Sequence, residues 1–381
     1  MKRNLRGCLL AVGLTAITLS VFAQTEFDSL SRRGYFGVGL EKASAGARVF
    51  TVSPGSTAAQ SGIVVGDVIE AVDGKAAVSP EAVVAAIGLH RSGDVVRIDL
   101  LRKADHQHIE ATLKAYPLEQ MANATVHYGS VTVLPGVRLR TILSIPSASS
   151  NSRFPAVLLI QGGGCGSIDT PLSANMGQSG LMHAIGSHGF VTMRVEKSGV
   201  GDSQGMPCES IGFKEELAGY HAALKALQSH PTVDVQRVYL VGISLGGVFA
   251  PLLGAETKVA GISVYGTLPG PPSPYPGRSE RFFQEIATAD IAGAWAKVAT
   301  RVQVLHGEYD TDNAVNRAAH ELIAAVVNKS AAGSAQFHEL PGLDHCWSRH
   351  ASLAASKDRC GQGEVTNVLS DAILDFLRAE R

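Results

Sequence analysis

The sequence has little excess of either charge. Its 381 residues carry a formal net charge of −1, and only 18% of them are charged. No basic block and no low-complexity tract occurs along the chain. This balance gives no support to nucleic-acid binding or to attachment to an anionic surface.

Long apolar runs are also scarce. The run from Cys8 to Phe22 is short for a bilayer span, and no second candidate follows. Basic residues precede it at positions 2–6, and Val21 and Ala23 are small residues at the −3 and −1 positions of a cleavage site. Residues 1–23 are therefore interpreted as a cleavable signal peptide, so we expect a periplasmic or secreted protein with no stable membrane span.

Cysteines are few, and no residues have the spacing of a metal site. Cys8 would leave with the signal peptide, and an even number in an oxidising compartment suggests two disulfides with three possible pairings, or alternatively buried free thiols. No C-x-x-C pair or histidine cluster occurs, and His106 and His108 are interpreted as surface residues of a strand. We expect neither a metal nor a cofactor. The remaining cysteines are Cys165, Cys208, Cys346 and Cys360.

Residues 33–115 have the pattern of a small β-rich domain. A β-rich run, residues 47–52, comes first, and a strand ending in the turn Asp73-Gly74 follows. A Ser-Pro pair at Ser79 predicts the start of a helix, and residues 95–101 predict a final strand.

This region resembles a bacterial-type PDZ domain. The resemblance rests on Tyr35-Phe36-Gly37-Val38, on Pro54-Gly55-Ser56 and on Gly66-Asp67-Val68-Ile69. It implies that the backbone N–H groups of Tyr35, Phe36, Gly37 and Val38 bind the carboxylate of a protein C-terminus, which adds as an extra strand. Alternatively, the domain only packs against its neighbour.

After a predicted linker, residues 116–125, strands and helices alternate to the end of the chain. The apolar stretch Ala156–Ile160 is typical of a strand buried on both faces of a sheet. Such alternation predicts an α/β fold with a mostly parallel sheet flanked by helices. Residues 269–298 do not fit it and are predicted to form a small cap. We expect strands at 131–133, 137–143, 190–195, 259–265, 302–305 and 336–340, and helices at 181–187, 213–229, 316–327 and 365–377.

A strand, a tight turn and a helix are predicted around Ser244. An apolar run from Val238 ends at Gly242, and Ser244 and Gly246 complete a G-x-S-x-G motif. The turn would hold Ser244 in a strained conformation that exposes its hydroxyl. A second match places Ser203 at its centre, but no apolar strand precedes it, so Ser203 is interpreted as a loop residue.

The order of elements across residues 126–381 resembles the α/β-hydrolase superfamily. The resemblance implies a catalytic acid after the second strand beyond Ser244, where Asp310 is favoured over Asp312 and Glu308. It implies a catalytic base after the last strand, where His345 stands. In such a triad the histidine takes the proton of the serine and the carboxylate orients the histidine.

The resemblance also implies two backbone donors for the oxyanion. One is the N–H of Leu245, and the other belongs to the glycine-rich loop after Ile160, where we favour Gly163 over Gly164. Gln161 stands where a histidine often precedes these glycines in esterases, which leaves the subfamily open.

The fold implied by the resemblance suggests a cysteine pairing. Loops at one edge of a parallel sheet meet over the active site, so we expect Cys165 to pair with Cys208. Cys346 follows His345 directly, and we expect it to pair with Cys360 and to fix the loop that carries the base.

We therefore expect an exported serine hydrolase that needs no cofactor. A carboxylic-ester hydrolase acting through a Ser244 acyl-enzyme is favoured, with the PDZ domain binding a peptide or partner. A serine peptidase is the first alternative. A non-catalytic binding protein is the second, although intact Ser244, Asp310 and His345 argue against it.

Overall fold

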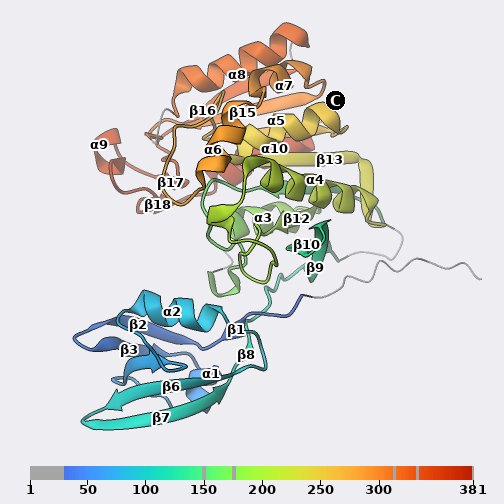
Figure 1. Ribbon diagram of the computed structural model, residues 1–381. Helices are drawn as coiled ribbons and strands as arrows, with labels where there is room; N and C mark the ends of the chain where they lie inside the picture. The colour runs from blue at the N-terminus through green and yellow to red at the C-terminus, as the bar shows by residue number, and fades with distance from the viewer. Residues whose placement is uncertain (1–29, 148–151, 174–176, 312–314, 332–333, 380–381) are drawn as a thin grey trace, which may run out of the picture.

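The computed structural model describes residues 30–147, 152–173, 177–311, 315–331 and 334–379. These residues form a small N-terminal part rich in strands and a larger part in which helices flank a central sheet (Figure 1). The predicted signal peptide, residues 1–23, lies outside the described residues.

The N-terminal part is an antiparallel sheet with two short helices. Its sheet has the order β2-β3-β4-β6-β7, with β5 paired to β4, while β1 pairs with β8 where the chain enters and leaves. Ser56 and Ser79 cap the two helices by accepting hydrogen bonds from backbone N–H groups three residues on. The elements are β1 (Gly34–Tyr35), β2 (Val38–Ala43), β3 (Gly46–Val52), α1 (Thr57–Gln60), β4 (Val68–Val72), β5 (Lys75–Ala76), α2 (Pro80–Gly88), β6 (Val95–Arg102), β7 (Asp105–Thr112) and β8 (Lys114–Ala115).

The larger part is built on one eight-stranded sheet with the order β16-β15-β14-β13-β11-β12-β10-β9. The six strands from β16 to β12 are parallel to one another. Strand β10 pairs antiparallel with β12 on one side and with β9 on the other. The strands are β9 (Ala124–Leu134), β10 (Val137–Pro146), β11 (Phe154–Ile160), β12 (Val191–Val195), β13 (Val233–Ile243), β14 (Gly261–Tyr265), β15 (Arg301–Gly307) and β16 (Ala335–Leu340). The predicted mostly parallel α/β sheet is confirmed.

Helices cover both faces of this sheet. In β11, Leu158 packs into the core on one face and Leu159 into the core on the other, which explains why the strand is apolar throughout. One face is covered by α4 (Phe213–Ser229), α5 (Gly246–Glu256), α6 (Glu280–Ala287), α7 (Ile291–Lys297) and α8 (Arg317–Ser330), and the other by α3 (Gly177–Ser187) and α10 (Val368–Arg378). The short elements are η1 (Pro171–Ser173), η2 (Cys208–Ser210), β17 (Ser348–Arg349), α9 (Leu353–Ser356) and β18 (Glu364–Val365).

Two stretches differ from the prediction. The predicted linker, 116–125, contains a buried residue: Glu119 is 3% exposed and pairs with buried Arg194, and β9 already begins at Ala124. The hairpin strands are longer than expected because this segment continues the sheet.

The predicted cap, residues 269–298, divides into two. Its first part lines the cleft described below, through residues such as Tyr275. Its last part, α7, packs against α5 and α8 and buries Trp295 in the core beside the sheet. The sequence did not predict that α7 packs against the sheet. A helix of seven residues is too short to show a periodic pattern of apolar residues that would indicate its buried face.

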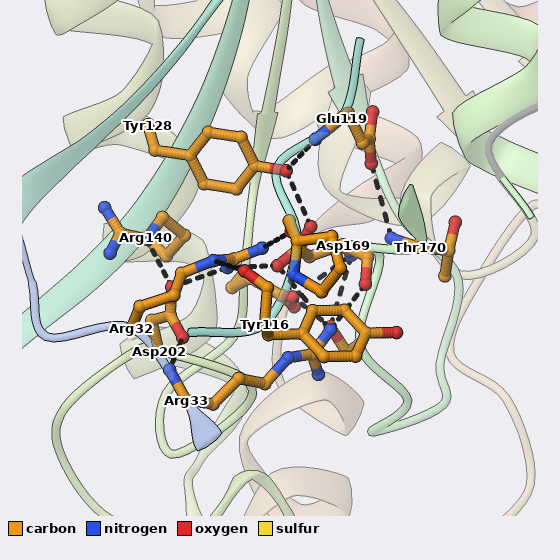
Figure 2. A network of polar contacts seen from close by, with 12 residues as sticks. Arg32, Arg33, Tyr116, Glu119, Tyr128, Arg140, Asp169, Thr170 and Asp202 are labelled. Carbon is orange, nitrogen blue, oxygen red and sulfur yellow. Dashed lines mark hydrogen bonds and ion pairs between the residues drawn. The ribbon is translucent and has the colours of Figure 1, made fainter. Parts of the chain in front are cut away.

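A buried polar network joins the two parts (Figure 2). The guanidinium of Arg32 pairs with Asp169 and with Asp202, and the backbone N–H of Arg33 donates to Asp202 at 2.8 Å. Arg140 of β10 also pairs with Asp202, at 3.0 Å. Because Asp169 and Asp202 lie in loops at the carboxyl edge of the large sheet, the network ties the N-terminal part to that edge.

Candidate active site

The candidate residues gather where the parallel strands of the large sheet end. The glycine-rich loop follows β11, Ser244 follows β13, Asp310 follows β15 and His345 follows β16. Because these strands run in the same direction, their carboxyl ends lie at one edge, and residues far apart in the sequence meet there.

Ser244 lies at the tip of a strained turn between β13 and α5. Its φ angle is +52°, a left-handed value that non-glycine residues adopt at a cost of about 1–3 kcal/mol. The turn needs glycine beside it, because a Cβ on Gly246 would lie 2.0 Å from the carbonyl oxygen of Ile160. The tight contact with β11 thus holds the serine at the edge of the sheet.

The structure brings together the three residues predicted to form a triad. Nε2 of His345 lies 3.0 Å from Oγ of Ser244, and Nδ1 of His345 lies 2.8 Å from Oδ2 of Asp310. The Asp310 side chain is fully buried, whereas that of His345 is 15% exposed. The imidazole is therefore partly open to an adjoining cleft on the side of the serine, while the buried carboxylate binds its other nitrogen.

Gly266, just after β14, leaves the space that the side chains of Asp310 and His345 occupy. The sequence analysis did not predict this role for Gly266. A Cβ there would lie 2.9 Å from Oδ2 of Asp310 and 3.0 Å from Nδ1 of His345, and its φ angle is +58°. Any side chain would push against the acid or the imidazole. Its position directly after a strand of the predicted sheet was the available signal.

Asp344 organises the loop that carries His345. Its buried carboxylate accepts hydrogen bonds from the backbone and hydroxyl of Ser348, from His350 and from the backbone N–H of Gly361. Burial alone would raise the pKa of Asp344, but these hydrogen bonds outweigh it and lower the pKa. The sequence showed Asp344 only as the neighbour of the predicted base.

The alternative candidates have other partners. Oγ of Ser203 accepts a hydrogen bond from the backbone of Arg140, and Glu308 accepts one from the backbone of Gly342. Another histidine close to the site, His320 of α8, is buried: its Nε2 accepts from the backbone of Thr267, and burial lowers the pKa of His320 to about 4. Asp312 lies outside the described residues.

The glycine-rich loop borders the serine. A Cβ on Gly162 would lie 3.4 Å from Cβ of Ser244, and one on Gly163 would lie 3.6 Å from the side chain of Leu245. A Cβ on Gly164 would meet nothing within 4 Å. The two predicted oxyanion donors, Gly163 and Leu245, are thus neighbours beside Ser244.

A cleft of about 700 Å³ opens over these residues. The described residues that line it include no Asp, Glu, Lys or Arg. Its lining is formed largely by apolar and aromatic side chains and glycine backbone, including Leu268, Pro271, Pro272, Tyr275, Val315 and Trp347.

Residues 34–113 match the PDZ domain family. A segment of 133 residues is 29% identical to the esterase EstD of Thermotoga maritima and covers 35% of this chain and 30% of EstD. The chain thus matches less than a third of the length of that relative.

Solved structures resemble the larger part. Est1E of Butyrivibrio proteoclasticus, solved with ferulic acid bound, aligns with a TM-score of 0.50 at 17% identity over 65% of this chain and 97% of that one. Dipeptidyl peptidase 4 of Porphyromonas gingivalis aligns with a TM-score of 0.50 at 14% identity over 75% of this chain and 40% of that one. At such identities the likeness concerns the fold alone.

The chain joins a PDZ domain to an α/β-hydrolase fold. One segment is thus similar to an esterase, and the larger part has the α/β-hydrolase fold.

The predicted ligand loop of the PDZ domain lies at the start of its edge strand. Phe36 is buried in the domain core, Gly37 has a φ angle of +78°, and Val38 begins β2. Within the described chain, β2 is the last strand of its sheet and has one edge without a strand partner. Tyr35 instead belongs to β1 and pairs with Lys114.

The four cysteines pair as expected in the α/β-hydrolase fold. Cys165 is bonded to Cys208, and Cys346 is bonded to Cys360. The first bridge ties the glycine-rich loop to the loop before α4. The second joins the residue after His345 to a segment 14 residues further along.

No group of metal-ligating side chains occurs in the part of the chain that the structure describes. Likewise, none of the described helices is long and apolar enough to cross a membrane.

Proposed function

We propose that this protein is a serine hydrolase that cleaves carboxylic esters. The proposal is carried by the chain of contacts from Asp310 through His345 to Ser244, with distances of 2.8 Å and 3.0 Å. This is the geometry that a nucleophile, a general base and an orienting carboxylate require.

In the proposed reaction, Oγ of Ser244 attacks the ester carbonyl while Nε2 of His345 takes its proton. Asp310 holds the imidazole with Nε2 toward the serine and stabilises the imidazolium. The backbone N–H groups of Leu245 and Gly163 donate to the developing oxyanion, an interaction worth about 2.7–4 kcal/mol per donor. His345 then protonates the leaving alcohol. Water, activated by the same imidazole, releases the acid and regenerates the enzyme.

The cleft supports an uncharged, apolar or aromatic substrate. Its described lining contains Trp347, Tyr275 and Leu268, and no permanently charged side chain of the described residues faces an incoming substrate. An ester fits this surface better than a peptide with a charged terminus, because a buried charge without a partner is costly.

We further propose export and peptide binding. The sequence of residues 1–23 and the two disulfides support an oxidising compartment, the periplasm or the exterior. The open edge of β2 supports binding of a protein C-terminus as an added strand. Cell fractionation tests the first proposal, and titration of the protein with C-terminal peptides tests the second.

The nucleophile is tested with a matched pair of variants. Ser244→Ala should abolish hydrolysis of p-nitrophenyl esters and labelling by a fluorophosphonate, whereas Ser203→Ala should retain both. Labelling that survives in Ser244→Ala would contradict the proposal. Faster turnover of aminoacyl or prolyl p-nitroanilides than of esters by the unmodified protein would identify a peptidase instead.

A further inference from the structure

Two buried cations hold the carbonyl oxygens of the glycine-rich loop. Nζ of Lys197 donates to the oxygen of Gly162 at 2.6 Å and to that of Gly164 at 2.8 Å. Between them, Nη1 of Arg278 donates to the oxygen of Gly163 at 3.1 Å. Every carbonyl of the three glycines thus bonds to a cationic side chain.

The cluster is closed by one carboxylate. Glu216 of α4 accepts from Lys197 at 3.1 Å and pairs through its other oxygen with Arg278. All three side chains are at most 2% exposed. Nζ of Lys197 faces three acceptors, which matches the three N–H bonds of an ammonium group. Burial lowers the pKa of Lys197 even though Glu216 acts to raise it.

These contacts fix the direction of the N–H groups as well. In a trans peptide unit, the carbonyl of one residue points opposite to the N–H of the next. A Gly162 carbonyl directed at Lys197 therefore turns the N–H of Gly163 away from the cluster. A Gly163 carbonyl directed at Arg278 does the same for the N–H of Gly164.

The glycine-rich loop also borders the active-site cleft, which the two cations do not line. The three glycines line that cleft together with Ser244, whereas neither Lys197 nor Arg278 is among its described lining residues. Glycines have no side chains with which to anchor a loop, so the loop depends on bonds to its backbone.

We propose that Lys197 and Arg278, balanced by Glu216, are positioning residues for the oxyanion site. They hold the glycine-rich loop with its N–H groups toward the cleft and polarise its peptide groups so that these N–H groups donate more strongly. This inference rests on the proposed serine hydrolase function, because it assigns a role within that reaction.

Two variants test the inference without burying an unpaired charge. Lys197→Met leaves Arg278 paired with Glu216, and Arg278→Met leaves Lys197 paired with Glu216. With a short-chain p-nitrophenyl ester, each variant should lower kcat by about 10- to 100-fold, less than the 10²- to 10³-fold typical of removing a donor altogether. KM should change by less than about two-fold, because the oxyanion forms only in the transition state.

An inhibitor provides the second readout. An alkyl trifluoromethyl ketone adds to the serine and places a negative oxygen in the oxyanion site, so its affinity should fall by the same factor as kcat/KM. Arg140→Met is the control, because Arg140 is an equally buried cation whose hydrogen bonds go to Asp202 and to the carbonyls of Gly129 and Leu30. It should lose stability but keep kcat and inhibitor affinity.

Unchanged kcat and inhibitor affinity in folded Lys197→Met or Arg278→Met would overturn the inference, as would a rise in KM alone. If Lys197→Met does not fold, Arg278→Met decides. If the unmodified protein neither hydrolyses esters nor reacts with fluorophosphonates, the proposed function fails instead, and the two failures are distinguishable.

Discussion

At the scale of single residues, Ser244 shows how reactivity is set against stability. Its left-handed backbone is held by the contact between Gly246 and β11, and it directs the hydroxyl to Nε2 of His345. Natural proteins retain such strained residues where the surrounding fold imposes them, and active sites are the usual place.

This strain predicts a difference between two inactive variants. Ser244→Gly should be more stable than Ser244→Ala by about 1 kcal/mol, because alanine keeps the left-handed penalty whereas glycine does not. Urea unfolding followed by tryptophan fluorescence measures this difference in stability, since both tryptophans, Trp295 and Trp347, lie in the larger part of the protein. An alanine variant as stable as the glycine variant would show that the turn is relaxed.

At the scale of elements, the loops after β11 and β12 form one buried polar unit. Glu196, at the end of β12, accepts hydrogen bonds from the hydroxyl of Ser167 and from the backbone of Ile168 and Asp169. Burial raises the pKa of Glu196 to about 7, because these bonds do not fully replace the water that the carboxylate loses.

The raised pKa predicts how stability depends on pH. The ordinary pKa of a glutamate is 4.5. Between this pH and pH 7, Glu196 is protonated in the folded state but ionised in the unfolded state. Stability should therefore fall as pH rises through this window, by up to about 3 kcal/mol, and level off above it. Glu196→Gln should remove this slope in urea unfolding between pH 5 and 8.

An exposed glutamate provides the control for this pH dependence. Glu209 is exposed in the short helix η2 before α4, so Glu209→Gln should keep the slope of the unmodified protein. If Glu196→Gln and the unmodified protein have the same slope, Glu196 does not titrate in this window.

At the scale of the whole molecule, the two parts have separate hydrophobic cores and are joined by the buried network of Figure 2. The pairing of β1 with β8 brings the two ends of the PDZ domain together, with Gly34 opposite Ala115. Arg32 and Arg33 precede this pair and make the contacts to Asp169 and Asp202. The domain could therefore be removed without removing the arginines.

Replacing residues 34–115 with a short Gly-Ser linker should leave the larger part of the protein folded. Turnover of a small p-nitrophenyl ester should stay within about two-fold, because no PDZ residue lines the described cleft.

Deleting residues 24–115 instead removes Arg32 and leaves Asp169 without that partner, which should cost about 3–5 kcal/mol if the carboxylate stays buried. Equal stability of the two truncations would contradict the role of the network, and loss of ester turnover by the linker variant would show that the PDZ domain completes the active site.

The sequence by itself determined the fold class and the candidate residues. An apolar strand such as β11 and the G-x-S-x-G turn are local patterns, and the turn indicated Ser244, whereas the resemblance to the α/β-hydrolase superfamily indicated Asp310 and His345. Local patterns succeed here because a tight turn needs glycine at fixed spacing and a doubly covered sheet needs apolar strands. The roles of these residues stay predictions that activity measurements must test.

Only the tertiary structure decided what supports those residues. Lys197 and Arg278 at the glycine-rich loop and Arg32 between the two parts have no distinctive neighbours in the sequence. Their partners lie on other strands and loops. The sequence around Gly266 predicts only that it follows a strand, and not that it contacts the acid and the base. The burial of Glu119 in the predicted linker and the packing of α7 from the predicted cap against the core are also known only from the structure. Burial of a charge and close contacts of a glycine depend on residues that are far apart in the sequence and meet only in the folded chain, so the spacing of residues in the sequence does not predict them.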